Sequence, residues 1–247
     1  MNLVKHYVRI KTIDSKTPVY QVTLNGKTLV GSAPAKTLLI DLYKTHVGDY
    51  PKFYKMDPLC RAGFIASELL LKTEKNGCLD NWTNTDDSIC KNPKTTKPQN
   101  PKIQYGESRG VVLFNAASSL ADDRNYQATI NNSETAFPSP SLFVYTLPNV
   151  LTGEIAIRNH YYGETNFIVL PELDCDVMAC AIEMTFSDLS LQSLITGWVD
   201  CYSETDYDVL MFIVGRSSIQ TLISGGLDSM SSFQNELSQE IKILTSK

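Results

Sequence analysis

Residues 139–163, SPSLFVYTLPNVLTGEIAIRNHYYG, form the stretch that decides the predicted fold. Thr146 can cap a helix that runs from about Leu147 to Arg158, and Pro148 costs this helix little because it lies in the first turn. The residues after Gly163 change to a short β-branched run and then to a second helical pattern. This order of helix, strand and helix favours an α/β domain.

The regions on either side extend the alternation. The run Gly110–Phe114, GVVLF, is unbroken and apolar, as expected of a strand that is buried on both faces of a sheet. Asn25-Gly26 predicts a two-residue hairpin turn between PVYQVTL and KTLVGS. The other expected elements are strands at residues 4–13, 166–170, 194–201 and 209–214, a surface loop at 76–106, and helices at 32–47 (capped by Ser32), 57–75 (capped by Asp57), 118–130 (capped by Ser118 or Ser119), 171–186 and 232–244. The sequence therefore predicts an α/β fold, a mixed sheet layered with helices, with one domain at residues 1–215 and a C-terminal tail at 216–247.

The composition is that of an ordinary globular protein. The chain has 247 residues, of which 43% are hydrophobic and 20% are charged, so it can bury a sizeable core. Residues 163–247 carry thirteen acidic and three basic residues, a net charge of −10, and the total of −5 leaves +5 for residues 1–162. Because phosphate binding needs clustered cations, this distribution argues against a nucleic-acid binder.

The cysteine, histidine and apolar patterns exclude several kinds of site. The six cysteines contain no CxxC pair and only three histidines accompany them, so we expect reduced thiols, no metal site and no cofactor. No apolar stretch is long enough to span a bilayer, and the start MNLVKHYVRI has no secretory h-region. We therefore expect a cytoplasmic protein.

Residues 139–163 resemble the segment upstream of the nucleophile in β-ketoacyl synthases. In that family a proline-bearing loop, an asparagine and a helix of small residues lead to a glycine and then to a strand. Met56–Arg61 and Gly110–Asn115 fall in the order and approximate spacing of two earlier family elements. The chain is similar to the short ketosynthase-like proteins of aryl-polyene and flexirubin-type pigment pathways, and the resemblance implies the N-terminal half of a thiolase-like fold.

The family nucleophile is a cysteine at the turn between that strand and the next helix. Counting forward from Gly163 by the family spacing reaches Glu172 or Leu173, whereas counting backward from Gly197 reaches Cys180. We favour the forward register because the upstream match is richer than a single glycine. The position of the nucleophile is then occupied by a carboxylate or a leucine, and no catalytic residue is predicted.

The local chemistry favours the same register. Pro171-Glu172-Leu173-Asp174 is expected in the first turn of a helix, where carboxylates complement the free N–H groups. Cys175 lies between two aspartates that oppose its ionisation, and Cys180 is expected about two turns inside the helix. Both thiols are therefore interpreted as structural. None of the histidines, which are His6, His46 and His160, lies at a position where it would assist as a base.

The resemblance also implies partners and an interface. Family members dimerise through the strand before the nucleophile, and the matching residues here are Asn166, Phe167, Ile168, Val169 and Leu170. The candidates for an acyl channel are Phe143, Tyr145 and Asn149. Our hypothesis is a non-catalytic subunit that pairs with a full-length ketosynthase in fatty-acid or polyketide biosynthesis of the aryl-polyene type. Two alternatives stay open: an acyl-thioester enzyme that uses Cys180 or Cys175, and a homodimer that binds acyl chains or acyl carrier protein.

Overall fold

A computed structural model describes residues 3–13, 20–30, 35–76, 106–131, 138–219 and 230–246. Within these ranges the strands of the sheet are β1 (Val4–Thr12), β2 (Tyr20–Leu24), β3 (Lys27–Val30), β4 (Arg109–Asn115), β5 (Thr165–Val169), β6 (Ser193–Ser203) and β7 (Asp206–Gly215). The helices are α1 (Ala35–His46), α2 (Pro58–Asn76), α3 (Leu120–Ile130), α4 (Pro140–Tyr145), α5 (Val150–Asn159), α6 (Cys175–Thr185) and α8 (Met230–Thr245). Short 3-10 helices occupy Pro51–Lys55 and Gly106–Ser108.

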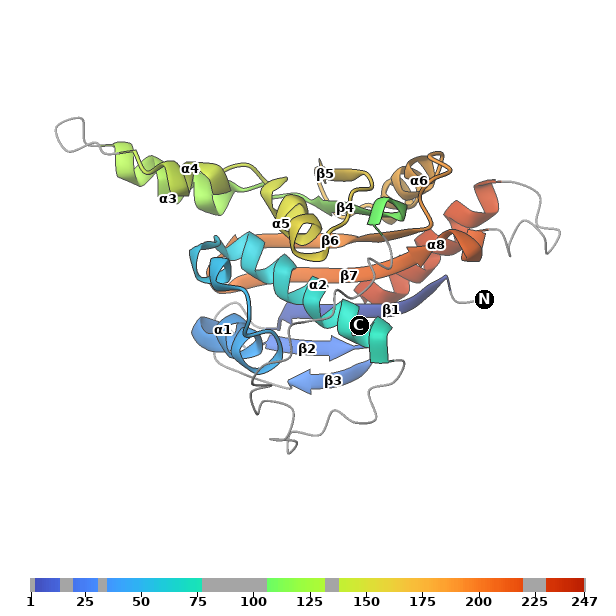
Figure 1. The fold of residues 1–247 in the computed structure, drawn as a ribbon, viewed down its shortest axis with the longest axis horizontal. Coiled ribbons are helices and arrows are strands. Elements are labelled where there is room, and N and C mark those ends of the chain that lie inside the picture. Colours follow the sequence, from blue (N-terminus) through green and yellow to red (C-terminus); the bar gives the residue numbers. More distant parts are fainter. Residues whose placement is uncertain are drawn as a thin grey trace.

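The strands form one mixed sheet in the order β3-β2-β1-β7-β6-β4-β5 (Figure 1). β4 runs parallel to both β5 and β6, whereas the other neighbouring strands are antiparallel. The predicted α/β class with a mixed sheet is therefore confirmed. β5 has a partner on one side only among the described strands, and it forms one edge of the sheet.

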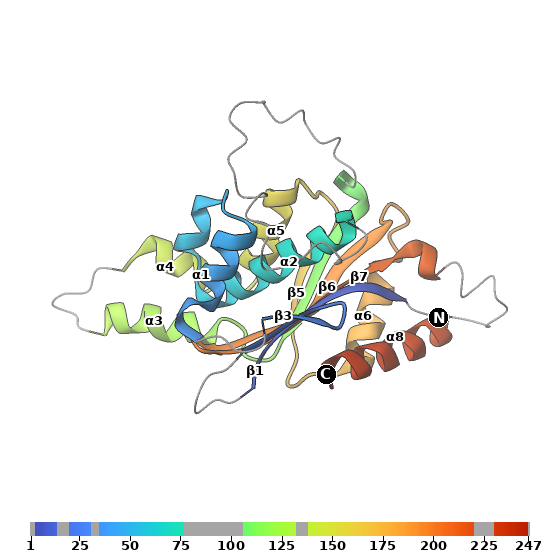
Figure 2. The same ribbon diagram turned by 90° about the horizontal axis from the view of Figure 1, so that it is seen from below.

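Helices cover both faces of the sheet (Figure 2). α1, α2 and α5 lie on one face, where their apolar side chains share a core with the sheet. α6 and α8 lie on the other face and form a second core with it. β4 is buried along its whole length, as its apolar run predicts. α3 and α4 project away from these layers as an arm (Figure 1).

Two predictions from local sequence are confirmed at atomic detail. Asn25 and Gly26 connect β2 to β3 with φ values of +48° and +81°, the positive angles that a tight hairpin turn needs. Asp57 caps α2, because its carboxylate accepts hydrogen bonds from the N–H groups of Leu59 and Cys60, each at 3.1 Å. The predicted C-terminal helix is confirmed as α8.

The predicted helix from Leu147 to Arg158 is wrong at its start. Ser139 caps a separate short helix, α4, which ends at Tyr145, and α5 begins only at Val150. Thr146 therefore closes α4 and does not open α5: its hydroxyl donates to the carbonyl of Phe143 at 2.7 Å. A threonine between two helical segments can cap the helix that follows or end the helix that precedes it. The local sequence is the same in both cases, so tertiary contacts decide between them.

Three other predicted helix starts either differ in the structure or lie outside the described residues. The helix expected from Pro171 begins at Cys175, because the Asp174 carboxylate accepts the N–H groups of Asp176 and Val177 at 2.9 and 3.0 Å. Ser119 does precede α3, but its hydroxyl donates to the carbonyl of Thr146 and caps no N–H group. Ser32 and almost all of the predicted loop at 76–106 lie outside the described residues.

A buried carboxyl group lies where the arm joins the sheet. The residue Asp122, in the first turn of α3, is only 3% exposed, and its Oδ2 atom has no hydrogen-bond partner among the described residues. Burial, together with the negative charges of Asp57 and Asp123, raises the pKa of Asp122 to about 6. The folded chain therefore holds this proton more tightly than the unfolded chain does, and this group makes the fold less stable as pH rises from about 4 to 6.

Replacing Asp122 with asparagine is expected to raise the melting temperature by several degrees at pH 7.5, because the amide cannot ionise in this buried place. Below about pH 4 the Asp122 carboxyl is protonated in both the folded and the unfolded chain, so the difference in melting temperature between the variant and wild type should vanish. Thermal unfolding followed by circular dichroism between pH 4 and 8 measures both effects. Asp41→Asn is the matched control, since Asp41 is exposed on another helix, α1. Equal melting curves for Asp122→Asn and wild type at pH 7.5 would contradict this account.

Candidate functional site

The connection between β5 and α6 is the corner at which the sequence comparison places the family nucleophile. Glu172 is exposed here, and Leu173 is half-buried against the core on the α6 face of the sheet. The next residue, Asp174, takes up two N–H groups of the first turn of α6. A carboxylate thus already occupies the end of the helix that would otherwise stabilise a thiolate.

Cys175 is the thiol nearest to this corner, and its surroundings oppose ionisation. It is the first residue of α6 and only 5% exposed. Burial raises the pKa of the Cys175 thiol above its ordinary value; Lys242 lowers it, while Asp176 and Asp174 raise it further. At neutral pH this thiol therefore stays protonated and poorly nucleophilic.

The remaining described cysteines are distributed over the fold. Cys180 is half-buried in the second turn of α6. Cys60 and Cys201 are buried, and burial raises the pKa of both thiols well above the ordinary range. Cys78 and Cys90 lie outside the described residues.

A covalent inhibitor directed at ketosynthases is expected to label no single cysteine cleanly, because an inhibitor of this kind requires an activated thiolate. A small maleimide in excess should instead modify Cys180 before the buried Cys175. Mass spectrometry of peptides measures both, and labelling in guanidinium provides the control in which every thiol reacts. Rapid, selective labelling of Cys175 or Cys180 by the inhibitor would contradict the inert interpretation and support the acyl-thioester enzyme.

The three histidines lie on different elements. His6 belongs to β1, His46 ends α1, and His160 follows α5 with a φ of +55°. Burial, and then the charge of Lys72, lowers the pKa of His46 to about 4, so this ring is neutral at physiological pH. The described residues therefore do not bring a cysteine and two histidines together at the corner.

β5 has a backbone edge that pairs with no other strand of the described ranges. The carbonyl of Glu164 accepts the N–H of Val111, and the N–H of Leu170 donates to the carbonyl of Asn115, both at 2.8 Å. Because strand groups alternate in direction, Thr165, Phe167 and Val169 direct their N–H and C=O groups away from β4. Such an edge is a ready template for another strand.

Exposed apolar side chains flank this free edge on both faces of the sheet. On one side Ile157 and Tyr162, at the end of α5, are 63% and 65% exposed. On the other side Val177 and Met184 of α6 are 44% and 69% exposed, and Val169 on the strand itself is 48% exposed. Exposed apolar side chains around an edge strand are candidates for an interaction surface.

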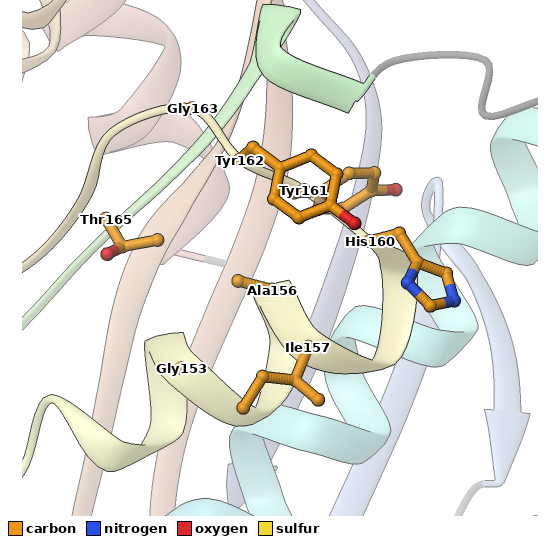
Figure 3. Close-up of a pocket in the computed structure, with 8 residues that line it drawn as sticks. All are labelled: Gly153, Ala156, Ile157, His160, Tyr161, Tyr162, Gly163 and Thr165. Carbon is orange, nitrogen blue, oxygen red and sulfur yellow. The ribbon is translucent and has the colours of Figure 1, made fainter.

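A groove of about 510 Å³ runs between α5 and the start of β5. Figure 3 shows Ala156 on the side of α5 that faces Thr165, with Ile157 next to it on the same helix. The small residues Gly153 and Ala156 open the groove, because they leave the outer face of the helix without large side chains. Sequence analysis missed this groove, although an apolar residue beside two small ones on a helix face is the signal that points to it.

The structure distributes the three acyl-channel candidates along the arm and the start of α5. Phe143 is 51% exposed and contacts Tyr126 of α3 with ring centroids 5.5 Å apart. Tyr145 packs against the core on the α2 face, and burial raises its pKa to about 12. Asn149 stands at the start of α5, where its carbonyl accepts the hydroxyl of Thr152. The groove beside β5 contains none of the three candidates.

Two further searches concern the described residues alone. No group of three or more His, Cys, Asp or Glu side chains there is arranged to hold a metal ion. None of the helices in the described part of the chain has the length and apolar character needed to cross a membrane.

Comparison with known proteins shows which solved structures share this fold. No family model and no curated protein matches the sequence. Among solved structures, "The ishigamide ketosynthase/chain length factor" matches with a TM-score of 0.54 and 13% identity over 87% of this chain. The chain has a ketosynthase-type fold. It spans 62% of the length of the ishigamide chain.

Two further solved structures match with TM-scores of 0.45. One is the ketosynthase ApeO in complex with its chain length factor ApeC from Xenorhabdus doucetiae, at 9% identity over 86% of this chain and 77% of that one. The other is AntDE:AntF, an acyl-carrier protein in complex with its ketosynthase, at 10% identity over 88% of this chain and 64% of that one. The predicted thiolase-like, ketosynthase-type fold is thus confirmed by the ishigamide structure alone.

Proposed function

We propose that this chain is a non-catalytic ketosynthase-like subunit of the cytoplasm that pairs through β5 with an active β-ketoacyl synthase. Its setting would be fatty-acid or polyketide biosynthesis of the aryl-polyene type. The observation that supports the proposal is the corner between β5 and α6, which holds Glu172 and Leu173 and, among the described residues, no thiol that is poised to ionise. Cys175, the adjacent thiol, is buried and has a raised pKa.

The pairing rests on the free edge of β5. Three residues of this strand direct unpaired backbone groups outward, and apolar side chains flank them on both faces of the sheet. A partner strand would satisfy the backbone groups, and the groove beside α5 would receive its side chains. The ishigamide structure, which shares this fold, is named as a ketosynthase with a chain length factor.

In such a pair, the surface shape of this chain would set the length of the product. The α3–α4 arm carries exposed apolar side chains, among them Phe143 and Leu147 at 51% and 49%. Tyr145 and Asn149 continue the same stretch towards the body of the molecule. We place these residues beside the acyl channel of the partner, where their size would limit the chain that fits.

Co-expression with the ketosynthase from the same gene neighbourhood tests the proposal. The tagged chain should co-purify with that enzyme at equal stoichiometry. Supplied alone with acyl and malonyl thioesters of acyl carrier protein, it should form no β-keto product, whereas the pair should form product of a defined length. Condensation by the purified chain alone, or a chain that binds no ketosynthase, would refute the proposal.

A further inference from the structure

The charges at the two ends of β5 have the same sign. Glu164 precedes the strand, Glu172 and Asp174 follow it, and all three are exposed. No cation of the described residues forms an ion pair with Glu164 or Glu172. The strand therefore begins with the exposed polar residues Thr165 and Asn166, continues with apolar residues, and is acidic at both ends.

The stretch of sequence around β5 carries no positive charge of its own. No lysine or arginine occurs between Arg158 and Arg216, a stretch that includes β5 and all of α6. Arg158 itself binds Asp49 and Glu68. Arg216 is held by backbone carbonyls at the end of α6, including that of Leu191 at 2.5 Å. Lys242 reaches the start of α6 but binds Asp176, and within the described ranges neither Glu164 nor Glu172 has an ion-pair partner.

Self-association would bring these like charges together. Two copies that pair through β5, with their helices on the same faces of a continuous sheet, must run antiparallel. The start of each strand then lies beside the end of the other, so Glu164 of one copy meets Glu172 and Asp174 of its partner. Two-fold symmetry produces this meeting twice. Like charges at an interface cost enough to suppress a wrong partner.

We infer that the β5 edge rejects a second copy of this chain and selects a partner of different sequence whose edge strand carries lysine or arginine at its ends. This inference rests on the proposed pairing through β5, and it decides between a heterodimer and a homodimer. The apolar side chains around the edge give attraction without selectivity. The carboxylates supply the selectivity, because only a basic partner turns their repulsion into attraction.

The chain itself is the probe for a test. Glu164→Lys gives one end of the edge a positive charge and leaves the other acidic, so two copies become complementary at both contacts. We expect this variant to dimerise at least about tenfold more tightly than wild type. Analytical ultracentrifugation over a concentration series measures the dissociation constants. The gain should fall towards zero in about 1 M sodium chloride, which screens these exposed charges.

Two controls locate the effect. Asp41→Lys makes the same change in net charge on an exposed position of α1, far from β5 in the fold, and it should stay as monomeric as wild type (Figure 1). Adding Val169→Pro to Glu164→Lys should abolish the new dimer, because proline removes an outward N–H of β5. A new dimer that survives this second substitution lies elsewhere and overturns the inference.

The remaining outcomes separate this inference from the proposed function. A wild-type chain that dimerises as tightly as Glu164→Lys, or a Glu164→Lys chain no tighter than Asp41→Lys, overturns charge selection while pairing with a ketosynthase can still hold. Absence of a ketosynthase from the co-purification refutes the proposed function, whatever the ultracentrifuge records. Monomeric wild type together with a salt-sensitive Glu164→Lys dimer supports the inference.

Discussion

Val169→Pro should leave the chain folded and weaken its pairing with a ketosynthase by about tenfold or more, which corresponds to about 1.4 kcal/mol. The Val169 N–H points away from β4, so its loss breaks no hydrogen bond within the described sheet. Proline is tolerated on an edge strand for this reason. A partner strand, however, would lose a donor and meet the proline ring. Co-purification at matched expression measures the loss.

Two companion variants show whether the effect is specific. Val169→Thr keeps the β-branched shape and the N–H group, so it should pair as wild type does. Ile168→Pro removes an N–H that faces β4 and should lower the melting temperature of the chain. If Val169→Pro co-purifies with the ketosynthase as efficiently as Val169→Thr, the free edge of β5 is not the interface.

Among substitutions that add one methyl group to the sheet, Gly197→Ala should reduce stability the most. Gly197 lies in β6 between Leu113 of β4 and Met211 of β7, and its φ is +145°. A Cβ atom there would lie 1.9 Å from the carbonyl oxygen of Leu210. Backbone in two central strands would have to move, so we expect a loss of roughly 3 kcal/mol or more.

Urea unfolding followed by tryptophan fluorescence measures this loss. Gly153→Ala is the matched control, because its added Cβ has no atom within 4 Å and its position is helical. That substitution should stabilise the chain by roughly 0.5–1 kcal/mol. Wild-type stability for Gly197→Ala would show that the two strands are further apart than the structure has them.

The parts of the fold that the sequence predicted depend on short-range chemistry. Asn25-Gly26 favours a hairpin turn between strands, and Asp57 caps a helix through the N–H groups two and three residues after it. The starts of α5 and α6 were missed because several adjacent side chains can cap a helix. The choice depends on contacts such as that of Ser119 with the Thr146 carbonyl, 27 residues away.

The sequence predicted the candidate site only where the identity of a single residue decides whether chemistry is possible. The absence of a cysteine at Glu172 and Leu173 is visible in the sequence, and the fold places both residues at the corner after β5. The groove beside α5 depends on how Ile157 and Thr165 meet in space, which local pattern does not contain. The charge at the ends of β5 likewise acquires meaning only once Glu164 and Glu172 are known to bracket a free edge.

The position of β1 in the sheet determines when the sheet can form during synthesis. β1 joins the β2–β3 hairpin to the remaining strands only through β7, which begins at Asp206. On the ribosome, the first strands must therefore wait until β7, which ends at Gly215, has been synthesised before their sheet can close. Nascent chains would expose the apolar residues of β1 throughout elongation, and chaperone binding at this stage should protect them from aggregation.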